Sequence, residues 1–337
     1  MKRDELYVGV DVGGTTVRAA VVDAFGHVLG QEKHRLQSRE PPQVAEAVVR
    51  AAKTACGAAG LPFTELKAMG LGVSGMIQKS TGVVLSAPAL GWRDVPFIKL
   101  LQARAPKLPM WIASDLQVCA WGERAAGAGR GVDDLIVVLV GSSVGLGIIL
   151  AGKLLEGASG VAGELGHILV HPGGRLCSCG KRGCLEAYAG GQSLASWARD
   201  DIRIATAAGR ASGKPSLLGK KLIEQAAGDL EKITAAAMER AAHEGCELSR
   251  RLLDEAGRML GASLANLITV LNPARMLLGG AVLAGSPRMM RATIESIDAN
   301  TGKAARLALH LSTPELGEQS GVVGAALLAH ESLARAA

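Results

Sequence analysis

Two glycine-rich turns, each placed between two apolar runs, constrain the fold of this 337-residue chain more than any other feature. The first turn is Gly13–Gly14 in VGVDVGGTTVRAAVVDAFG, where we predict three short strands over residues 7–29 and a further turn at residues 24–26. The second turn is the GSSVGLG segment of residues 141–147, which lies between apolar runs that we predict to be strands. The repeated order of strand, turn and strand predicts two related lobes that face a cleft.

Helices alternate with strands along the first half of the chain. Apolar spacing predicts helices at residues 43–59 and 117–126, and a strand at residues 66–73 runs into the Ser74–Gly75 loop. Further strands are predicted at residues 135–140 and 147–150. Such alternation is typical of α/β proteins with a largely parallel sheet.

The last third of the chain is predicted to be mostly helical. Leucine and alanine recur at intervals of three and four residues and predict a long helix that ends before Asn272–Pro273. A short strand at residues 275–278 should lead into Gly279–Gly280. We expect Ser212–Pro215 to form an exposed loop, because glycine and proline interrupt the helical pattern there.

Charge and composition exclude several classes of protein. The net charge of +6 is dispersed along the chain and aromatic residues make up 3%, a combination that does not favour nucleic-acid recognition. No apolar stretch is long enough to cross a bilayer, so we expect no membrane association. The charged segment Met1–Leu6 lacks the apolar core of a secretory signal, which predicts a cytoplasmic protein with reduced thiols.

The first glycine turn carries groups that suit a bound phosphate. Glycines allow the backbone to approach an anion closely, hydroxyls donate hydrogen bonds, and a carboxylate can hold hydrated magnesium. An unliganded hairpin explains this stretch equally well when it is considered alone. A second glycine turn in a matching context favours two phosphate loops around one nucleotide. The candidate residues are Asp11, Gly13, Gly14, Thr15, Thr16, Gly141, Ser142 and Gly145.

A histidine and three cysteines occur together in GHILVHPGGRLCSCGKRGC. One imidazole and three thiolates form the tetrahedral ligand set that zinc prefers, and a closed set leaves no open position for a catalytic water. We therefore predict a structural zinc held by His167, Cys177, Cys179 and Cys184. His171 is a rival for the fourth ligand, and three unligated thiols are the alternative.

Three carboxylates complete the candidate site: Asp115, Glu164 and Glu186. Glu164 lies three residues before His167 and Glu186 lies two after Cys184, so a zinc loop would hold both on one wall. A carboxylate accepts hydroxyl hydrogens and suits a polyhydroxylated ligand, although each residue taken singly could be a solvated or capping group.

With these residues assembled, the sequence resembles the ROK family, which unites bacterial sugar kinases and related transcriptional repressors. The resemblance covers nearly the whole chain. The matching segments are VGVDVGGTTVRAAVVD at 8–23, GELGH at 163–167, CSCGKRGCLEAYAG at 177–190, LNPARMLLGGAV at 271–282 and GVVGAALLA at 321–329. The resemblance implies an actin-like, ribonuclease-H-like α/β fold, with two lobes around a cleft and a zinc-binding loop at residues 167–184.

The resemblance also implies a division into lobes and a set of roles. Residues 1–117 would form the N-terminal lobe, joined by a C-terminal helix at about 318–337, and residues 118–317 would form the larger lobe. Asp115 would be the catalytic base and Gly279–Gly280 the adenosine-binding turn. Sugar contacts would come from Gly75, Ser114, Asp115, Glu164, His167 and Glu186. The family implies Mg-ATP and structural zinc as cofactors, and a homodimer.

Four positions depart from the family pattern. Ser114 and Ala89 stand where the kinases usually or often carry asparagine, and Ser143 and Leu146 replace glycines in the second phosphate loop. A Cβ at residue 143 could crowd a phosphate. These departures leave the predicted fold unchanged and bear on the identity of the sugar and on catalysis.

The leading hypothesis is ATP-dependent phosphorylation of a hexose, with glucose at its 6-hydroxyl first. The alternatives are kinases for N-acetylglucosamine, N-acetylmannosamine, fructose or allose, a sugar sensor without catalysis, and polyphosphate as the phosphoryl donor. Repressors of the family carry a DNA-binding segment before the first hairpin. Only seven residues precede Val8, so we expect a kinase rather than a repressor.

Overall fold

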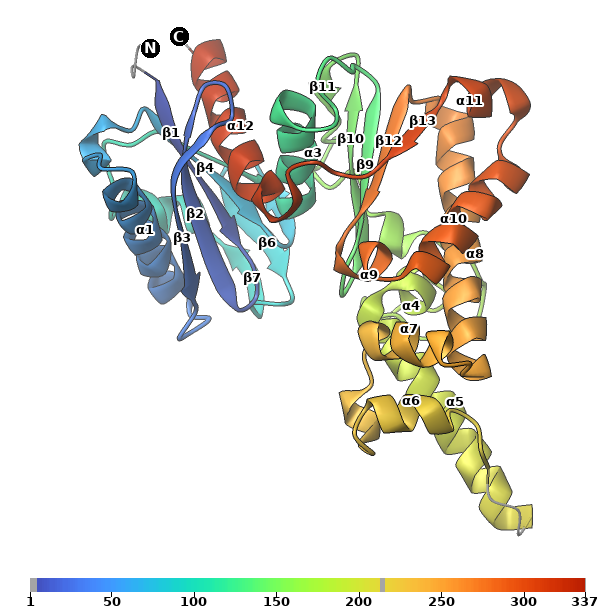
Figure 1. Cartoon of the computed structure of the whole chain (residues 1–337). Helices are drawn as coiled ribbons and strands as arrows, with labels where there is room; N and C mark the ends of the chain where they lie inside the picture. The colour runs from blue at the N-terminus through green and yellow to red at the C-terminus, as the bar shows by residue number, and fades with distance from the viewer. Residues whose placement is uncertain (1–4, 213–215, 337) are drawn as a thin grey trace.

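The computed structural model describes residues 5–212 and 216–336, and two five-stranded sheets flank a pair of helices in it (Figure 1). The first sheet has the order β3-β2-β1-β4-β8. Its strands are β1 (Leu6–Val12), β2 (Thr16–Asp23), β3 (Val28–Arg35), β4 (Ala68–Val73) and β8 (Met110–Ser114). The second sheet has the order β11-β10-β9-β12-β13. Its strands are β9 (Leu135–Val140), β10 (Val144–Leu150), β11 (Lys153–Leu154), β12 (Arg275–Gly279) and β13 (His310–Ser312).

The two large sheets share one pattern of strand directions. β1 pairs antiparallel with β2 and parallel with β4, and β9 pairs antiparallel with β10 and parallel with β12. The predicted repetition is therefore confirmed as two lobes of like topology. The expectation of a largely parallel sheet is wrong, because each glycine turn joins neighbouring strands directly and so short a connection permits only antiparallel pairing.

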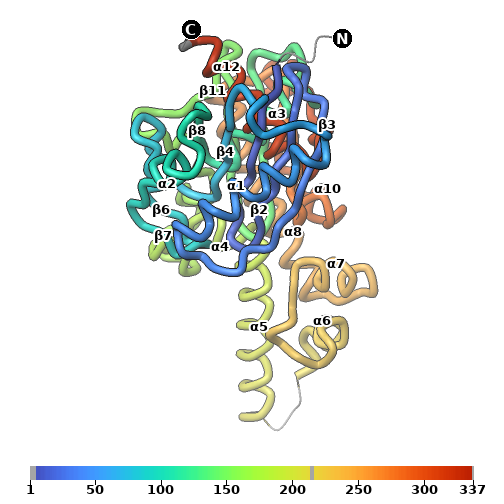
Figure 2. Tube along the Cα trace, turned by 90° about the vertical axis from the view of Figure 1, so that its left-hand side faces the viewer, coloured from blue at the N-terminus to red at the C-terminus, as the bar shows by residue number. Residues whose placement is uncertain are grey.

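Helices form layers on both sides of the sheets. α1 (Pro41–Ala58) packs on β2 and β3, while α3 (Asp115–Ala126) and α12 (Ser320–Ala336) lie between the two sheets (Figure 1). Beyond the second sheet, α8 (Glu247–Leu271) packs against α10 (Pro287–Asn300). The shorter elements are β5 (Met76–Gln78), β6 (Val83–Ala87), β7 (Trp92–Val95), α2 (Phe97–Gln102), α4 (Glu186–Ala189), α9 (Ala281–Ala284) and α11 (Lys303–Ala308). The helices α5 (Gly191–Ser212), α6 (Lys220–Gln225) and α7 (Ala235–His243) extend away from the sheets (Figure 2).

One glycine turn is shorter than predicted. Strand β10 begins at Val144, inside the segment expected to be a turn, so the turn itself is Gly141–Ser143. Helix α3 packs on this strand, and a Cβ on Gly145 would overlap the side chain of Leu116. Residue 145 must therefore be glycine because α3 packs so closely on β10, and not because the chain turns there.

Strand β9 has an uninterrupted apolar sequence, LIVVLV, and its position in the fold gives the reason. Ile136, Val138 and Val140 face the core formed with α8, whereas Leu135 and Val137 face the layer of α3 and α12. Successive side chains point to opposite faces of a strand, and both faces of β9 are buried. The sequence therefore lacks the alternation of a half-exposed strand.

Helix α12 lies directly on the backbone of the first sheet. A Cβ on Gly9 would overlap the carbonyl oxygen of Val322, and a Cβ on Gly70 would overlap that of Ala325. Residues that follow the second sheet in the chain thus pack with the first sheet, through a contact that leaves no room for a side chain.

A buried carboxylate ties together the two chain crossings between the lobes. Glu123 of α3 has 0% of its surface exposed. Its Oε1 accepts hydrogen bonds from Leu316 N at 2.9 Å and Ser320 Oγ at 2.8 Å. Its Oε2 accepts from Ala128 N at 3.0 Å and Glu315 N at 2.9 Å. The hydrogen bonds from Glu315, Leu316 and Ser320 hold the start of α12 against α3.

Some sequence predictions remain outside these observations. The division into two lobes at the 117/118 boundary stays a proposal, because α3 packs against strands of both sheets. In that division residues 1–117 and 318–337 form one lobe and residues 118–317 form the other. Of the loop predicted at Ser212–Pro215, Ser212 ends α5 and residues 213–215 lie outside the described ranges, as do residues 1–4. Within those ranges, no helix combines the length and the hydropathy needed to cross a membrane.

We predict that Gly70→Ala strongly destabilises the protein, because the new methyl group would overlap the Ala325 carbonyl of α12. Overpacking lowers the free energy of unfolding by about 1–3 kcal/mol where neighbouring side chains can move aside. At Gly70 the overlapping atom belongs to the backbone of α12, which cannot move aside as a side chain can. Urea unfolding should show a loss at or above that range. Gly57→Ala is the matched control: nothing lies within 4 Å of its new Cβ, so it should be neutral or stabilising. Equal stability of the two variants would contradict the close packing of α12.

Candidate active site

Asp115 lies at the first turn of α3, directly after strand β8. Ser114 caps the helix, because its Oγ accepts a hydrogen bond from Gln117 N at 3.2 Å. Asp115 Oδ1 accepts from Leu116 N at 2.9 Å, and the Ser74 hydroxyl lies near enough to this carboxylate to favour its charged form. The edge of the first sheet therefore presents an oriented carboxylate at a helix N-terminus, a position that favours negative charge.

A second aspartate shares this region. Burial raises the pKa of Asp115, although the hydrogen bonds from Ser74 and Leu116 oppose the shift. The pKa of Asp11, at the end of β1, rises to about 6, chiefly through burial and then through the negative charge of Asp115. Arg18 NH1 lies 3.9 Å from Asp11 Oδ2 and offsets this only in part. Two carboxylates with this excess of negative charge suit a divalent cation such as magnesium.

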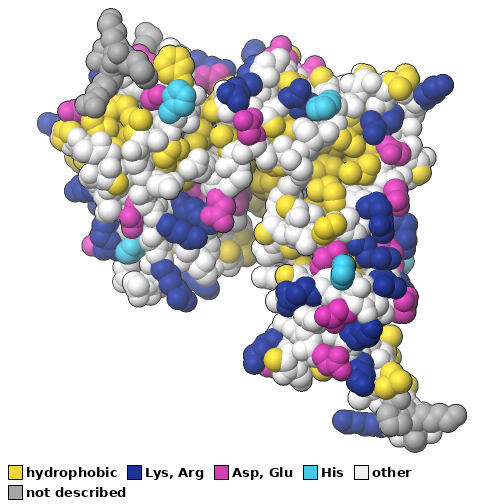
Figure 3. Space-filling model, viewed as in Figure 1, with side chains coloured by type: hydrophobic (Ala, Val, Ile, Leu, Met, Phe, Trp, Pro, Cys, Tyr) yellow, Lys and Arg dark blue, Asp and Glu magenta, His cyan; other side chains and the backbone are white. Residues whose placement is uncertain are grey.

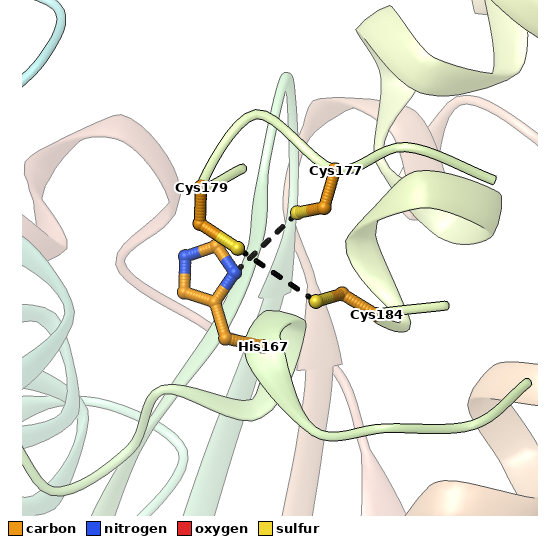
Figure 4. A group of neighbouring side chains, drawn as sticks. All are labelled: His167, Cys177, Cys179 and Cys184. Carbon is orange, nitrogen blue, oxygen red and sulfur yellow. Dashed lines mark hydrogen bonds between the residues drawn. The ribbon is translucent and has the colours of Figure 1, made fainter. Parts of the chain in front are cut away.

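Four side chains of the second lobe converge on one point, as Figure 4 shows. The ligand atoms of His167, Cys177, Cys179 and Cys184 all lie within 4.8 Å of one another. Cys177 Sγ is 3.6 Å from His167 Nδ1, and Cys179 Sγ is 3.7 Å from Cys184 Sγ. Zn–S bonds of about 2.3 Å in a tetrahedron separate two sulfurs by about 3.8 Å, so the set fits zinc. His167, rather than its rival His171, belongs to this group of described residues.

Two carboxylates flank the predicted zinc-binding loop of residues 167–184, which we call the zinc-type loop. Glu186 Oε1 accepts from Ser178 Oγ at 2.8 Å, and its Oε2 lies 3.3 Å from the Val144 N–H. Glu164 Oε2 lies 3.8 Å from His167 Nε2. Burial raises the pKa of Glu164 first, His167 opposes the shift, and the charges of Asp115 and Glu186 add to it. The charge of Asp115 in the first lobe thus reaches Glu164 in the second. The space-filling view shows a hollow between the two lobes (Figure 3).

The first glycine turn is tight and is packed against the rest of its lobe. Gly13 N donates to Thr16 O at 2.9 Å, and a Cβ on Gly14 would lie 2.8 Å from Ala89 Cβ. The loop that contains Ala89 therefore touches the turn directly. Gly75, in the following loop, packs in the same way against β6, because a Cβ there would overlap the Ser86 carbonyl.

The second glycine turn borders a cavity of about 510 Å³ within the second lobe. Gly141 N donates to Ser143 O at 2.9 Å, which closes the turn, and Ser142 lines the cavity. Gly280, with a φ of 89°, is the N-cap of α9, whose Ala281 and Val282 line the cavity, and a Cβ on Gly280 would overlap the backbone of Val140. The other lining residues include Gly191, Gln192, Ala195, Arg199, Thr234, Ala235, Ala281 and Val282. A largely apolar cavity beside two glycine turns suits a flat nucleobase.

Sequence reasoning missed several of these residues. Ser74 was passed over in favour of its neighbour Gly75, and nothing in its local sequence marks a hydroxyl that reaches Asp115. Gln192 of α5 and Thr234, the residue before α7, both line the cavity, although they are distant from each other and from the second glycine turn in sequence. The one available signal was the Gly190–Gly191 pair, which repeats the glycine pairs of the other turns.

Two lobes of like topology around a cleft define the actin-like ATPase fold. The crystal structure of a ROK family glucokinase from Streptomyces griseus, in complex with glucose and AMPPNP, matches with a TM-score of 0.77 and 32% identity over 97% of this chain and 99% of that one. The sequence matches the ROK family model over residues 7–332, and the chain belongs to the ROK family.

Relatives within the family differ in activity. A glucokinase of Streptomyces coelicolor is 33% identical over 327 residues, which cover 97% of this chain and 98% of that protein. A xylose repressor of Caldicellulosiruptor bescii is 30% identical over 288 residues, covering 81% of this chain and 65% of that protein. Family membership alone therefore does not distinguish catalysis from regulation.

We predict that the protein, purified without chelator, contains one zinc per chain. Cys179→Ser should lose the metal, because a structural site needs all four ligands, whereas Cys56→Ala should retain it, since Cys56 is buried in α1 far from the group. Elemental analysis together with circular dichroism checks both variants. Less than about half an equivalent in the wild type would contradict the zinc site, since structural sites hold the metal tightly.

We predict that Asp11→Asn stabilises the ligand-free protein at neutral pH. The pKa of Asp11 is about 6 in the folded chain against an ordinary 3.8, so folding takes up a proton between these values and the free energy of unfolding falls as pH rises through them. The asparagine avoids this loss, which is on the order of 1–3 kcal/mol. Urea unfolding at pH 4 and pH 7.5 checks the sign. The free energy of unfolding of the variant should exceed that of the wild type only at pH 7.5, and an equal increase at both pH values would contradict the prediction.

Proposed function

We propose that the chain is an ATP-dependent sugar kinase that phosphorylates a hexose, with glucose at its 6-hydroxyl as the leading substrate. The observation that carries the proposal is the half-buried Asp115, a carboxylate with a raised pKa that lies close enough to Glu164 of the other lobe to raise its pKa as well. A general base is most effective when its pKa approaches the working pH.

Asp115 would accept the proton of the attacking sugar hydroxyl. The hydrogen bond from the Leu116 N–H orients the carboxylate, and the nearby Ser74 hydroxyl favours its charged form. The hydroxyl gains nucleophilicity as its proton moves to the carboxylate while its oxygen bonds to the γ-phosphorus. The sugar phosphate and the nucleoside diphosphate are the products.

The zinc-binding loop of residues 167–184 and the residues that flank it would supply three of the six sugar contacts. Nδ1 of His167 faces Cys177 at 3.6 Å, so zinc at Nδ1 leaves Nε2 free toward Glu164, on the opposite side of the ring. Glu164 and Glu186 would accept hydroxyl hydrogens. The structural metal therefore acts on specificity by holding the imidazole in place.

The nucleotide would bind to the second lobe, with its base in the cavity beside Gly280 and its phosphates between the two glycine turns. The hydroxyls of Thr15 and Thr16 and the backbone N–H group of Gly14 are the donors proposed for the phosphates, while the N–H groups of Gly13 and Gly141 close the two turns. Asp11 and Asp115 would hold magnesium, which, when bound, neutralises charge on the transferring phosphoryl group. Approach of the lobes would exclude water as a competing nucleophile.

The departures from the family pattern have local explanations. Leu146 is 2% exposed, and its N–H donates to Gly163 O at 3.1 Å, directly before Glu164. The Leu146 side chain belongs to the same apolar core as Leu165, so it packs beneath the segment that carries a proposed sugar ligand. Ser114 still caps α3, and its hydroxyl hydrogen remains available to a sugar.

We predict that Asp115→Asn lowers kcat by about 10²–10⁴-fold, because the amide cannot take the hydroxyl proton. Sugar affinity should change much less, since the zinc-type loop is intact. ADP release over a panel of hexoses and amino sugars measures the first effect, and calorimetry of sugar binding measures the second. Asp298→Asn, an exposed residue of α10, is the matched control.

The same panel identifies the substrate. The sugar with the highest kcat/KM is the substrate, and a preference for an amino sugar over glucose would replace glucose in the proposal. Sugar binding without ADP release, in wild type and variant alike, would contradict the kinase and indicate a sensor.

A further inference from the structure

A second large cavity, of about 700 Å³, lies apart from the proposed catalytic residues. It is lined by the β5–β6 turn, α2 and β8 of the first lobe, by β11 of the second, and by α3 and α12. Figure 2 shows α2, β8, β11 and α12 on the same side of the molecule. We call it the Trp cavity, because Trp111 and Trp121 line it. None of the sugar, phosphate or zinc candidates contributes to it.

The floor of the Trp cavity is apolar. Ile98, Ile112 and Trp121 are each at most 9% exposed, and Trp111 and Leu154 are partly buried beside them. The indole Nε1 of Trp121 has no hydrogen-bond partner among the described residues. Two of the four tryptophans of the chain, one from β8 and one from α3, therefore line this cavity, and indole rings suit contact with the flat face of a ligand ring.

The rim of the cavity carries an excess of positive charge. Four cations line it, Lys79, Lys99, Lys153 and Arg335, against two carboxylates, Glu156 and Glu331. Both carboxylates are already paired: Lys79 Nζ lies 2.5 Å from Glu156 Oε1, and Arg335 contacts Glu331.

Two lysines on this rim are left for a ligand. In the described part of the chain, Lys99 of α2 and Lys153 of β11 make no ion pair. They come from different lobes, and both are exposed. A cavity whose entrance carries unpaired positive charges attracts an anion.

The cavity also spans the junction of the lobes. The Lys79–Glu156 pair crosses it from the β5–β6 turn to the segment after β11, and Gln117 Nε2 of α3 donates to Gly160 O in the same segment at 3.2 Å. That segment leads to Glu164 of the proposed sugar site. A ligand that contacts both walls would therefore affect how the lobes approach each other.

We propose that the Trp cavity binds a ring compound that carries a phosphate monoester, with the ring against Trp111 and Trp121 and the phosphate between Lys99 and Lys153. The size of the cavity is in the range of small-molecule sites. Two sources share this chemistry, a sugar phosphate and a nucleoside monophosphate. The proposal concerns binding and does not depend on the kinase activity.

Fluorine NMR of the full chain labelled with fluorotryptophan tests the proposal, since the four tryptophans give separate signals that Trp→Phe variants assign. Glucose 6-phosphate and AMP are titrated in separate arms, with glucose, AMPPNP and magnesium present to occupy the proposed active site. We expect one of the two to shift the Trp111 and Trp121 signals saturably, while Trp92 and Trp197 move little. Inorganic phosphate alone should have a weaker effect, because it lacks the ring.

Charge reversal provides the decisive comparison. The double variant Lys99→Glu/Lys153→Glu should weaken the apparent Kd by at least about tenfold, as expected when two charge-assisted contacts become repulsive. Lys67→Glu/Lys303→Glu, two exposed lysines outside the cavity, should leave it unchanged. Absence of a saturable shift with either compound, equal shifts of all four signals, or unchanged affinity in the Lys99/Lys153 variant would each overturn the proposal. Loss of sugar phosphorylation in other experiments would leave these results unaffected.

Discussion

The contact between α3 and α12 is the constraint on which the rest of the molecule depends. A Cβ on Gly122 would lie 2.5 Å from the Ser320 carbonyl, and one on Gly324 would overlap the Val118 carbonyl, so the two helices meet backbone to backbone. Glu123 adds three hydrogen bonds to the start of α12 and its approach. Since the chain passes between the lobes through these two helices, their crossing sets how one sheet lies against the other.

The same two helices present their N-termini to the candidate site. α3 begins with Asp115, and a Cβ on Gly321, in the first turn of α12, would lie 3.3 Å from Asp11 Cγ. Helix N-termini favour negative charge, which offsets part of the cost of holding two aspartates close together. The remaining cost is visible in the raised pKa of Asp11, and it fits a site organised to receive a cation and a phosphate rather than to maximise the stability of the empty protein.

Much of the fold could be predicted from local sequence, and the exceptions have identifiable causes. The three-stranded start, α1, α3, β9 and α8 follow from apolar periodicity and from glycine or proline at their ends. Strand β10 was placed too late, because Gly145 was interpreted as part of a turn, whereas it makes room for Leu116 of α3. The parallel character of the sheet was overestimated for a related reason: alternation of elements does not state which neighbours pair, and the short hairpins enforce antiparallel pairs.

The sequence by itself determined the members of the site that lie within one loop or one turn: the cysteines, the two glycine turns, and the carboxylates that flank the zinc ligands. Their separation in space is bounded by a few bonds of backbone, so spacing alone predicts their proximity. Tertiary structure alone decided that His167 joins the cysteines instead of His171, that Ser74 reaches Asp115, and that Glu123 holds the crossing of the lobes. The contacts of Ser74 and Glu123 join segments far apart in the chain, and only the packing of the sheets with α3 and α12 brings those segments together.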